Sequence, residues 1–367
     1  MAEPRPPQTT TFESSTAQRG LRRGLLSVLV FLAAIGLGLL ALSQTQVGAG
    51  AIAGLWARAR PELLLLALLS MTMAFFFMGL RWRALMPPGT QAAPGALMAI
   101  ICAGLLLNYA LPGPVGELGA AWLASRRYRL PLAHALASGV AARLVGLATA
   151  AVTAALVWAI ADLPVPAEYR RLVGGAVVLI GCGGAVLAAL TANPEPWKRL
   201  AHLLLDPLAR REGWAGPRSR RLLEAFDRTA EDLTEVVRSR PQAWLAAIGW
   251  SVASHGSVVT GIVLASAAFG AHADPAGLLF TYATSTAGAV VLFLLPGSQL
   301  GWDAMFLGLL VSSAGLPLAD ASAVALLVRV HHLLVMLLGA LALTWLLRRP
   351  AHSGSMEQPS TRGSPID

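Results

Sequence analysis

Long apolar stretches separated by short polar segments dominate the chain. A membrane-spanning helix needs about 20 predominantly apolar residues, and the stretches that approach or exceed this length are residues 25–43, 62–80, 94–111, 132–160, 171–192, 242–268, 276–295 and 320–347. Two shorter stretches, 115–125 and 303–316, remain. At about 1.5 Å per residue they cover only about 16 to 21 Å. We therefore expect re-entrant or broken helices at these two places.

The composition excludes an ordinary soluble domain. Hydrophobic residues make up 56% of the 367 residues, charged residues only 13%, and the mean hydropathy is +0.63. Such values are typical of a chain that crosses a membrane several times. The predicted fold class is therefore all-α, a polytopic transmembrane helix bundle.

A four-part pattern occurs twice in the same order, which indicates an internal duplication. In each copy, twelve residues separate the proline of a Leu-Pro-Leu-Ala tetrapeptide from an arginine inside an apolar stretch. The first copy consists of Leu111-Pro112-Gly113, Gly116 with Glu117, Leu130 to Ala133, and Arg143; the second consists of Leu295-Pro296-Gly297, Gly301 with Asp303, Leu316 to Ala319, and Arg329. Repeats built around Gly/Pro-broken apolar segments are typical of transporters.

The net charge of +9 is carried mainly by arginine and predicts the topology. Arg22 and Arg23 place the N-terminus in the cytoplasm. Other basic groups that fit this side are Arg81 with Arg83, Arg126 with Arg127 and Arg129, the run from Lys198 to Arg240, and Arg348 with Arg349. The stretch after Gly116 then returns to the cytoplasm and the stretch after Gly301 leads outward. Both termini are predicted to be cytoplasmic and the two repeats inverted, although Arg58 and Arg60 fall on the outer side.

The chain divides into one membrane domain and two tails. Residues 1–20 and 349–367, rich in Pro, Ser, Thr and Gly, are predicted to be disordered. Residues 21–348 form the transmembrane domain, and within it residues 194–241 form a polar insert with apolar residues at helical spacing. This amphipathic insert is either a cytoplasmic connector that obeys the positive-inside rule or a helix pair lying on anionic headgroups.

Arg143 and Arg329 are the main candidates for substrate binding. Each lies about 16 Å into its apolar stretch, near the middle of a hydrocarbon core about 30 Å thick. A charge at this depth is costly, so both side chains are expected to face a protein-lined or wet interior. They either pair with Glu117 and Asp303 and pin the repeats together, or bind a phosphate through paired hydrogen bonds.

The Gly/Pro breaks provide the second group of candidates. Pro112-Gly113 and Pro296-Gly297 end their helices, and Gly116 and Gly301 permit tight backbone before a new helix begins. Helix N-termini inside the membrane present unpaired N–H groups and partial positive charge, which suits an anionic headgroup.

Side chains near these breaks have alternative roles. Glu117 and Asp303 are expected to be helix-dipole partners, counter-ions to the arginines, or proton carriers. Asn108 either satisfies freed backbone groups or touches substrate.

Several weaker features receive structural interpretations. Cys102 and Cys182 lie in apolar stretches and read as small buried hydrophobes without a disulfide. His331 and His332 stand beside Arg329 and can modulate its field. A polar stripe on the sixth long stretch is read as helix packing; its members are Ser251, Ser254, His255, Ser257 and Thr260. No metal site and no cofactor are expected.

Three motifs together resemble a known family. They are Arg81-Trp82-Arg83 at the end of a span, N-Y-A-L-P-G-P-V-G-E at 108–117, and P-G-S-Q-L-G-W-D at 296–303. The chain resembles the lysylphosphatidylglycerol synthase transmembrane family of flippase-like proteins over most of residues 20–348, with P-x-x-x-G-E the most specific element. The resemblance implies a bacterial inner-membrane protein that moves lipids between leaflets: aminoacylated phosphatidylglycerol, or polyprenyl-linked or hopanoid lipids.

The chain departs from the family pattern at four positions. Gly119 and Ala120 stand where a basic residue is common, Ala142 where a Glu precedes the arginine, and Asp303 where Glu is usual. These departures leave the headgroup open. The 18 residues after Arg349 are too few for an aminoacyltransferase domain, so we expect that the chain does not make the aminoacyl lipid itself.

Three classes of function remain. The favoured one is a lipid translocase without catalytic activity, whose partners are a membrane lipid and the bilayer rather than nucleic acid. The second is a membrane-embedded enzyme acting on lipid phosphates, which needs a metal cluster or a nucleophile with a base. The third is a non-transporting subunit of a lipid or envelope synthesis complex. A homo-oligomer and a lipid-synthesis enzyme are the candidate protein partners.

Overall fold

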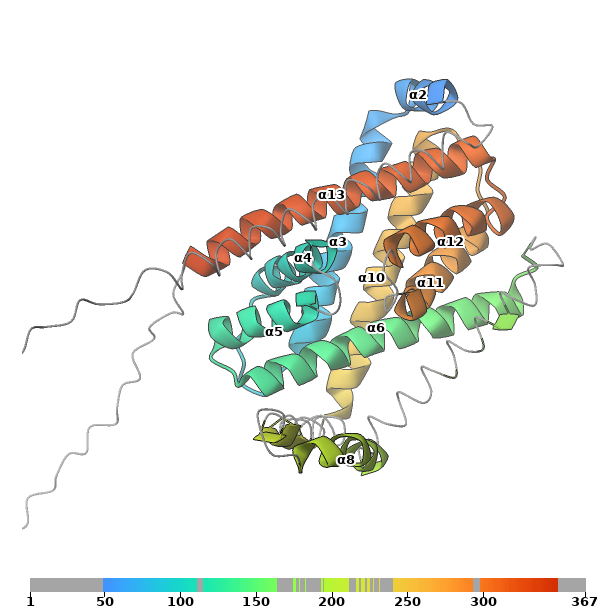
Figure 1. The fold of residues 1–367 in the computed structure, drawn as a ribbon. Coiled ribbons are helices and arrows are strands. Elements are labelled where there is room, and N and C mark those ends of the chain that lie inside the picture. The colour runs from blue at the N-terminus through green and yellow to red at the C-terminus, as the bar shows by residue number, and fades with distance from the viewer. Residues whose placement is uncertain are drawn as a thin grey trace, which may run out of the picture.

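A computed structural model describes residues 49–110, 115–163, 195–210, 240–292 and 298–348, together with isolated positions between 174 and 231. Within these residues the chain is helical, with turns between helices and no strand (Figure 1). The helices are α2 (Ala49–Arg58), α3 (Pro61–Leu85), α4 (Pro94–Ala110), α5 (Val115–Tyr128), α6 (Leu132–Ile160), α8 (Glu195–Ala209), α10 (Pro241–Ala268), α11 (Pro275–Leu292), α12 (Ser298–Ser312) and α13 (Leu318–Arg348).

Four helices are long and apolar enough to cross a membrane: α3, α6, α10 and α13. They confirm the predicted spans at 62–80, 132–160, 242–268 and 320–347. The predicted span at 25–43 and both tails lie outside the described residues, and so does most of the span at 171–192. Cys102 is buried as expected, but Cys182 is exposed, so its interpretation as a buried hydrophobe is wrong.

The ends of the long helices follow from local sequence. α3 and α10 begin with proline in the first turn, where its missing N–H costs nothing. Glu62 in the first turn of α3 and Arg348 in the last turn of α13 complement the helix dipole. The turn before α13 contains Gly315 with a φ of 69°, a conformation that favours glycine.

The order of helix lengths repeats along the chain. α3 to α6 contain 25, 17, 14 and 29 residues, and α10 to α13 contain 28, 18, 15 and 31 residues. We call these the first and second halves. Each contact between helices of one half has a counterpart in the other: α3 with α4 and α10 with α11, α4 with α5 and α11 with α12, α5 with α6 and α12 with α13. The structure thus repeats the duplication seen in the sequence.

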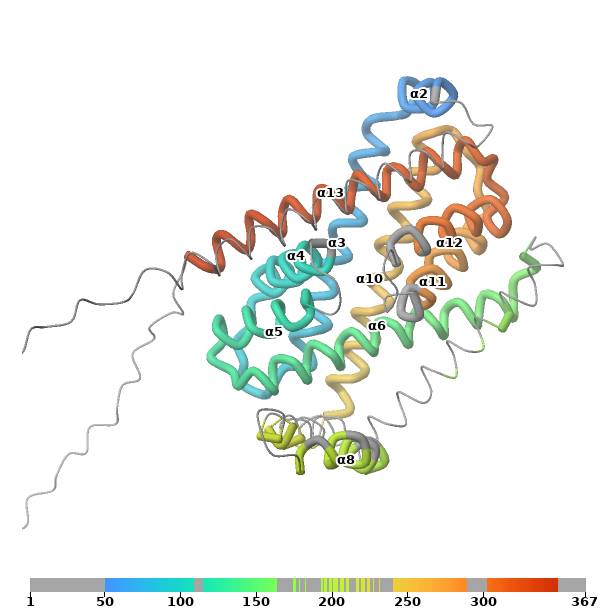
Figure 2. The backbone as a smooth tube through the Cα atoms, viewed as in Figure 1, coloured from blue at the N-terminus to red at the C-terminus, as the bar shows by residue number. Residues whose placement is uncertain are grey.

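The central helices α3 and α10 lie side by side and run in opposite directions (Figures 1 and 2). At one end the Arg60 amide donates to the Ala268 carbonyl over 3.0 Å. At the other end Arg240 Nη1 donates to the Met86 carbonyl over 3.0 Å. The first residues of each helix therefore meet the last residues of the other.

The two halves exchange their short helices. α4 of the first half packs on α13 of the second, and α11 of the second half packs on α6 of the first. The contact between α13 and α4 is close, because a Cβ at Gly339 would lie 2.7 Å from the backbone carbon of Cys102 and 3.2 Å from the Ala103 nitrogen. Small residues that let helix backbones approach are typical of helix packing in membranes.

The short stretches form helical hairpins rather than isolated limbs. α5 packs on α4, and α12 packs on α11. Both arms are short: at about 1.5 Å per residue, 17 and 14 residues cover about 25 and 21 Å. α4 matches the predicted apolar stretch at 94–111, and α5 matches the shorter stretch at 115–125. By contrast, α12 begins at Ser298, earlier than the predicted limb at 303–316.

The polar insert contains the helix α8, in agreement with the helical spacing of its apolar residues. Lys198 Nζ lies 2.6 Å from Glu231 Oε1, and His202 Nε2 lies 3.0 Å from Asp227 Oδ2. These pairs join α8 to the following segment of the insert, most of which lies outside the described residues.

Candidate functional site

Arg143 and Glu117 form an ion pair between α6 and α5, in which Arg143 Nη1 donates to Glu117 Oε1. The side chains are 48% and 22% exposed. Glu117 lies in the first turn of α5. Next to it the Gly116 amide donates to Asn108 Oδ1 over 2.7 Å, so Asn108 satisfies one of the free N–H groups of the helix start.

Arg329 and Asp303 form the corresponding pair between α13 and α12. Arg329 Nε donates to Asp303 Oδ1 over 2.6 Å, and Nη2 contacts the same oxygen. The guanidinium carbon also lies 5.6 Å from the centre of the Trp302 ring, within cation–π range. Asp303 is the sixth residue of α12 and no acidic residue occupies the first turn, so its expected role as a helix-dipole partner is wrong.

The two pairs are equivalent in sequence and position. In each, the carboxylate on the short helix precedes the arginine on the next long helix by 26 residues. Of the two predicted roles for the arginines, the structure shows the pairing with Glu117 and Asp303. Each pair lies within one half of the protein. The pairs therefore pin each short helix to its following long helix, and not one repeat to the other.

The breaks before α5 and α12 are only partly described. Pro112, Gly113, Pro296 and Gly297 lie outside the described residues. Gly301 lies within α12, not before it. Gly116 also lies inside its helix and is needed for close packing, because a Cβ there would overlap the Gly104 carbonyl oxygen of α4.

A polar cluster that sequence analysis missed lies where α3, α6 and α10 meet. Arg81 is only 6% exposed, and its Nη1 donates to Ser251 Oγ over 3.3 Å. A Cβ at Gly146 would overlap this guanidinium. His255 contacts the Gly146 carbonyl over 2.9 Å and the Tyr282 hydroxyl over 3.2 Å.

The spacing of Arg81 and Arg83 in the sequence already indicates that one of them is buried. Arg81 and Arg83 are both flanking charges under the positive-inside rule, but residues two apart face different sides of a helix. One of the two arginines therefore had to turn toward the bundle. The structure buries Arg81 and exposes Arg83.

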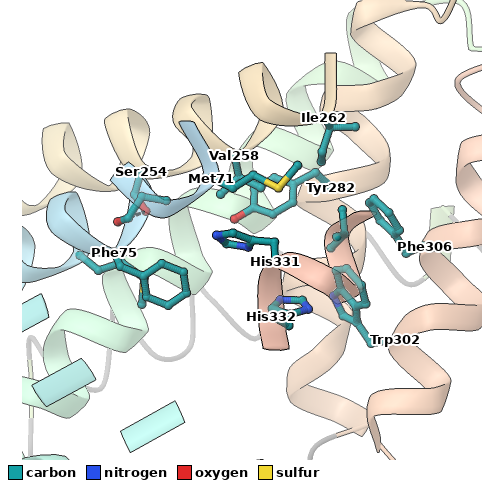
Figure 3. A pocket seen from close by; sticks show the side chains of 13 residues that line it. Met71, Phe75, Ser254, Val258, Ile262, Tyr282, Trp302, Phe306, His331 and His332 are labelled. Atoms are coloured by element: carbon teal, nitrogen blue, oxygen red, sulfur yellow. Dashed lines mark hydrogen bonds between the residues drawn. The ribbon is translucent and has the colours of Figure 1, made fainter. Parts of the chain in front are cut away.

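A cavity of about 120 Å³ lies among α3, α10, α11, α12 and α13 (Figure 3). Figure 3 shows His331 near the middle of the group and His332 beside Trp302. His331 Nε2 lies 3.2 Å from Thr72 Oγ1. The side chains that line the cavity include neither Arg143 nor Arg329, and they are mainly aromatic and apolar, among them Phe75, Tyr282, Trp302 and Phe306.

Two other hydroxyls of α10 serve packing, as predicted. Ser254 Oγ donates to the Ala74 carbonyl over 3.2 Å, and Ser257 Oγ donates to the Ser70 carbonyl over 2.5 Å. Both bonds join α10 to α3. Among the described residues no group of three or more His, Cys, Asp or Glu side chains is placed to hold a metal ion.

Four membrane-length helices, the hairpins packed between them and the charge pairs on those hairpins define a multi-pass helical membrane protein. The chain belongs to the family described as the lysylphosphatidylglycerol synthase TM region, whose model matches residues 25–339. The match confirms the resemblance drawn from the sequence motifs and supports a lipid-related role in the membrane. No curated protein and no solved structure matches the chain.

Proposed function

We propose that the protein is a lipid translocase of the flippase-like kind, which moves a lipid with an anionic or zwitterionic headgroup between the leaflets of a bacterial inner membrane. Aminoacylated or other anionic phospholipids, polyprenyl-linked lipids and hopanoid lipids are the candidate substrates. The protein carries out no chemical step in this proposal. The observation that carries it is the arginine–carboxylate pair that occurs once in each half with the same 26-residue separation.

The halves act as inverted repeats in this proposal. The antiparallel central helices α3 and α10 and the paired set of helix contacts support a pseudo-two-fold axis across those helices. An axis of this orientation lies in the membrane plane when the central helices span the bilayer. Transporters of this architecture expose a site to each side by moving one repeat against the other.

The hairpins α4–α5 and α11–α12 enter the bilayer without crossing it comfortably, as re-entrant segments do. Their length supports this assignment. Irregular backbone at membrane depth is tolerated where it is buried in protein or lines a cavity. The region beside Glu117 and Asp303 on these short helices therefore forms the wet region into which a headgroup enters.

Each ion pair acts as a gate that a headgroup can open. Both pairs are partly exposed, with side chains 22% to 48% accessible. A phosphate or carboxylate on a lipid can thus reach the arginine and replace the carboxylate there, because it offers the guanidinium an equivalent charge-assisted hydrogen bond.

This exchange uses two sites in turn rather than one shared site. Arg143 and Arg329 belong to separate pairs, and α6 and α13 share no extensive interface within the described residues. The two arginines therefore act at separate sites, one in each half.

The orientation follows the positive-inside rule, with the ends that bear Arg83, Arg127, Arg240 and Arg348 facing the cytoplasm. The Arg240 bond to Met86 supports this grouping. So does the 5.2 Å contact of the Arg127 guanidinium with the Trp345 ring near the end of α13.

The test is headgroup movement in proteoliposomes that contain fluorescently labelled phosphatidylglycerol, with an impermeant quencher added outside. Arg143→Ala and Arg329→Ala are expected to abolish the protein-dependent movement, whereas the exposed Arg83→Ala leaves it unchanged. All variants must elute as monodisperse protein. Wild-type rates in both site variants would refute the proposed sites. Turnover of lipid phosphates that a chelator abolishes would instead favour an enzyme.

A further inference from the structure

Arg81 is a buried cation with too few partners. Its one side-chain hydrogen bond among the described residues is the 3.3 Å contact with the neutral Ser251 hydroxyl, and no described carboxylate pairs with it. Its Nε is buried and has no acceptor. A buried charge that lacks a counter-ion is costly, so its retention calls for an anion that this conformation lacks.

Arg143 lies close to this cation on the exposed side. Gly146, which makes room for the Arg81 guanidinium, follows Arg143 by three residues on α6. Residues three apart lie on the same helix face, about 5–6 Å apart at Cβ. Arg143 on α6 is thus the outer cation, with its side chain 48% exposed, and Arg81, which reaches α6 from α3 at Gly146, is the inner one, only 6% exposed.

The second half lacks this arrangement. The residue three positions after Arg329 is His332, which packs against the Trp302 ring at 5.9 Å. An imidazole therefore fills the place that Gly146 leaves open for a guanidinium. The space beyond it is the mainly apolar cavity of Figure 3. The inner cation is a feature of the first half only, within the described residues.

We propose that Arg81 and Arg143 form an oxyanion site for the phosphate of a lipid headgroup, with Arg143 the outer ligand and Arg81 the inner one. The phosphate displaces Glu117 from Arg143 and then reaches the unfilled donors of Arg81. Planar guanidinium groups grip phosphate through paired hydrogen bonds. This inference rests on the proposed function only in identifying the anion as part of the lipid that is moved.

The test measures binding, which needs no translocation. Purified protein in dodecylmaltoside is titrated with phosphatidylglycerol, with diacylglycerol that lacks the phosphate, and with inorganic phosphate alone. Arg81→Met is expected to weaken phosphatidylglycerol binding about tenfold or more. Arg83→Met, the matched control two residues away on an exposed face, leaves affinity unchanged.

The melting temperature distinguishes a binding role of Arg81 from a purely structural one. If Arg81 binds the lipid, Arg81→Met is expected to keep or raise the melting temperature while losing the lipid, because a hydrophobic residue in place of an unpaired buried charge is often stabilising. A purely structural role predicts a lower melting temperature. If that variant does not fold, Gly146→Ala serves instead. Its Cβ meets only the movable end of Arg81 among the atoms nearest to it, and it is expected to weaken binding to a similar extent.

The outcomes separate this inference from the translocase proposal. Affinity within twofold of wild type in the folded Arg81 or Gly146 variant overturns the site, even when wild-type protein moves lipid. Loss of binding in the variant supports the site, even when wild-type protein moves none. Equal affinity for inorganic phosphate alone and for phosphatidylglycerol overturns the headgroup assignment in favour of a soluble anion.

Discussion

Gly116 fixes the position of α5, and through it the position of Glu117. A Cβ at Gly116 would overlap the Gly104 carbonyl oxygen and the Asn108 carboxamide, closer than van der Waals contact allows. The carbonyl belongs to the α4 backbone and cannot rotate away. Gly116→Ala therefore has to push α5 outward, which draws Glu117 away from Arg143.

The expected loss of stability comes from two opposing effects. Overpacking of a close contact costs about 1–3 kcal/mol, and a clash with fixed backbone belongs in the upper part of this range, about 2–3 kcal/mol. Alanine in place of glycine inside a helix gains about 1 kcal/mol. Gly116→Ala should therefore destabilise the protein by about 1–2 kcal/mol. Gly119→Ala on the same helix gains the same propensity, and its Cβ meets only the movable Leu107 side chain, at 2.5 Å for Cδ1. That variant should stay within about 0.5 kcal/mol of wild type.

The assay is thermal unfolding in detergent, followed by the loss of monodisperse protein. At roughly 2 °C per kcal/mol, Gly116→Ala should melt about 2–4 °C below Gly119→Ala. The same pair of variants is then compared in the proteoliposome assay, where only Gly116→Ala should slow headgroup movement.

Equal melting temperatures for the two variants would show that α5 does not depend on the contact between Gly116 and Gly104. A lower melting temperature with unchanged headgroup movement would instead show that the placement of Glu117 is unimportant for transport.

Two further predictions concern other contacts. Ser138→Ala removes the acceptor of the buried Trp82 Nε1–H, which lies 3.0 Å from Ser138 Oγ, and should lower the free energy of unfolding by about 1–3 kcal/mol. The control is Ser322→Ala, because the Ser322 hydroxyl donates to the Leu318 carbonyl of its own helix, and it should lower that free energy by less than about 0.5 kcal/mol. Equal losses in thermal unfolding would contradict this account. The hydrogen bond to Asp227 raises the pKa of His202, so its stabilisation of the insert is full below about pH 6.5 and is lost as the pH rises through the raised pKa. Hydrogen exchange in α8, corrected for the intrinsic rate, should therefore increase between pH 6 and pH 9 in wild type and not in His202→Ala; the same increase in both proteins would exclude His202 as its cause.

The sequence predicted the helices and the duplication because both depend on local patterns. Apolar runs bounded by arginine or proline define the four long spans, and the repeated Leu-Pro-Leu-Ala motif marks the start of α6 and α13. The spacing of Glu117 and Arg143 also allowed their pairing to be foreseen as one alternative.

The packing partners could not be predicted because they depend on contacts far apart in the sequence. No local pattern shows that α4 packs on α13, or that Gly146 accepts the Arg81 guanidinium. Arg81 was interpreted as a flanking charge because the positive-inside rule considers position along the chain and not the side of the helix. The substrate roles of the Pro112 and Pro296 breaks stay predictions.

The exchange of hairpins between the halves has a consequence for biogenesis. The partner of α4 is α13, the last described helix to be synthesised, so the first hairpin must wait in the membrane with this packing face uncovered until α13 has been synthesised. Neither half can reach its native arrangement alone, since each supplies the surface against which the other half's hairpin settles. Assembly of these helices is thus a late, concerted step that joins the first half to the second.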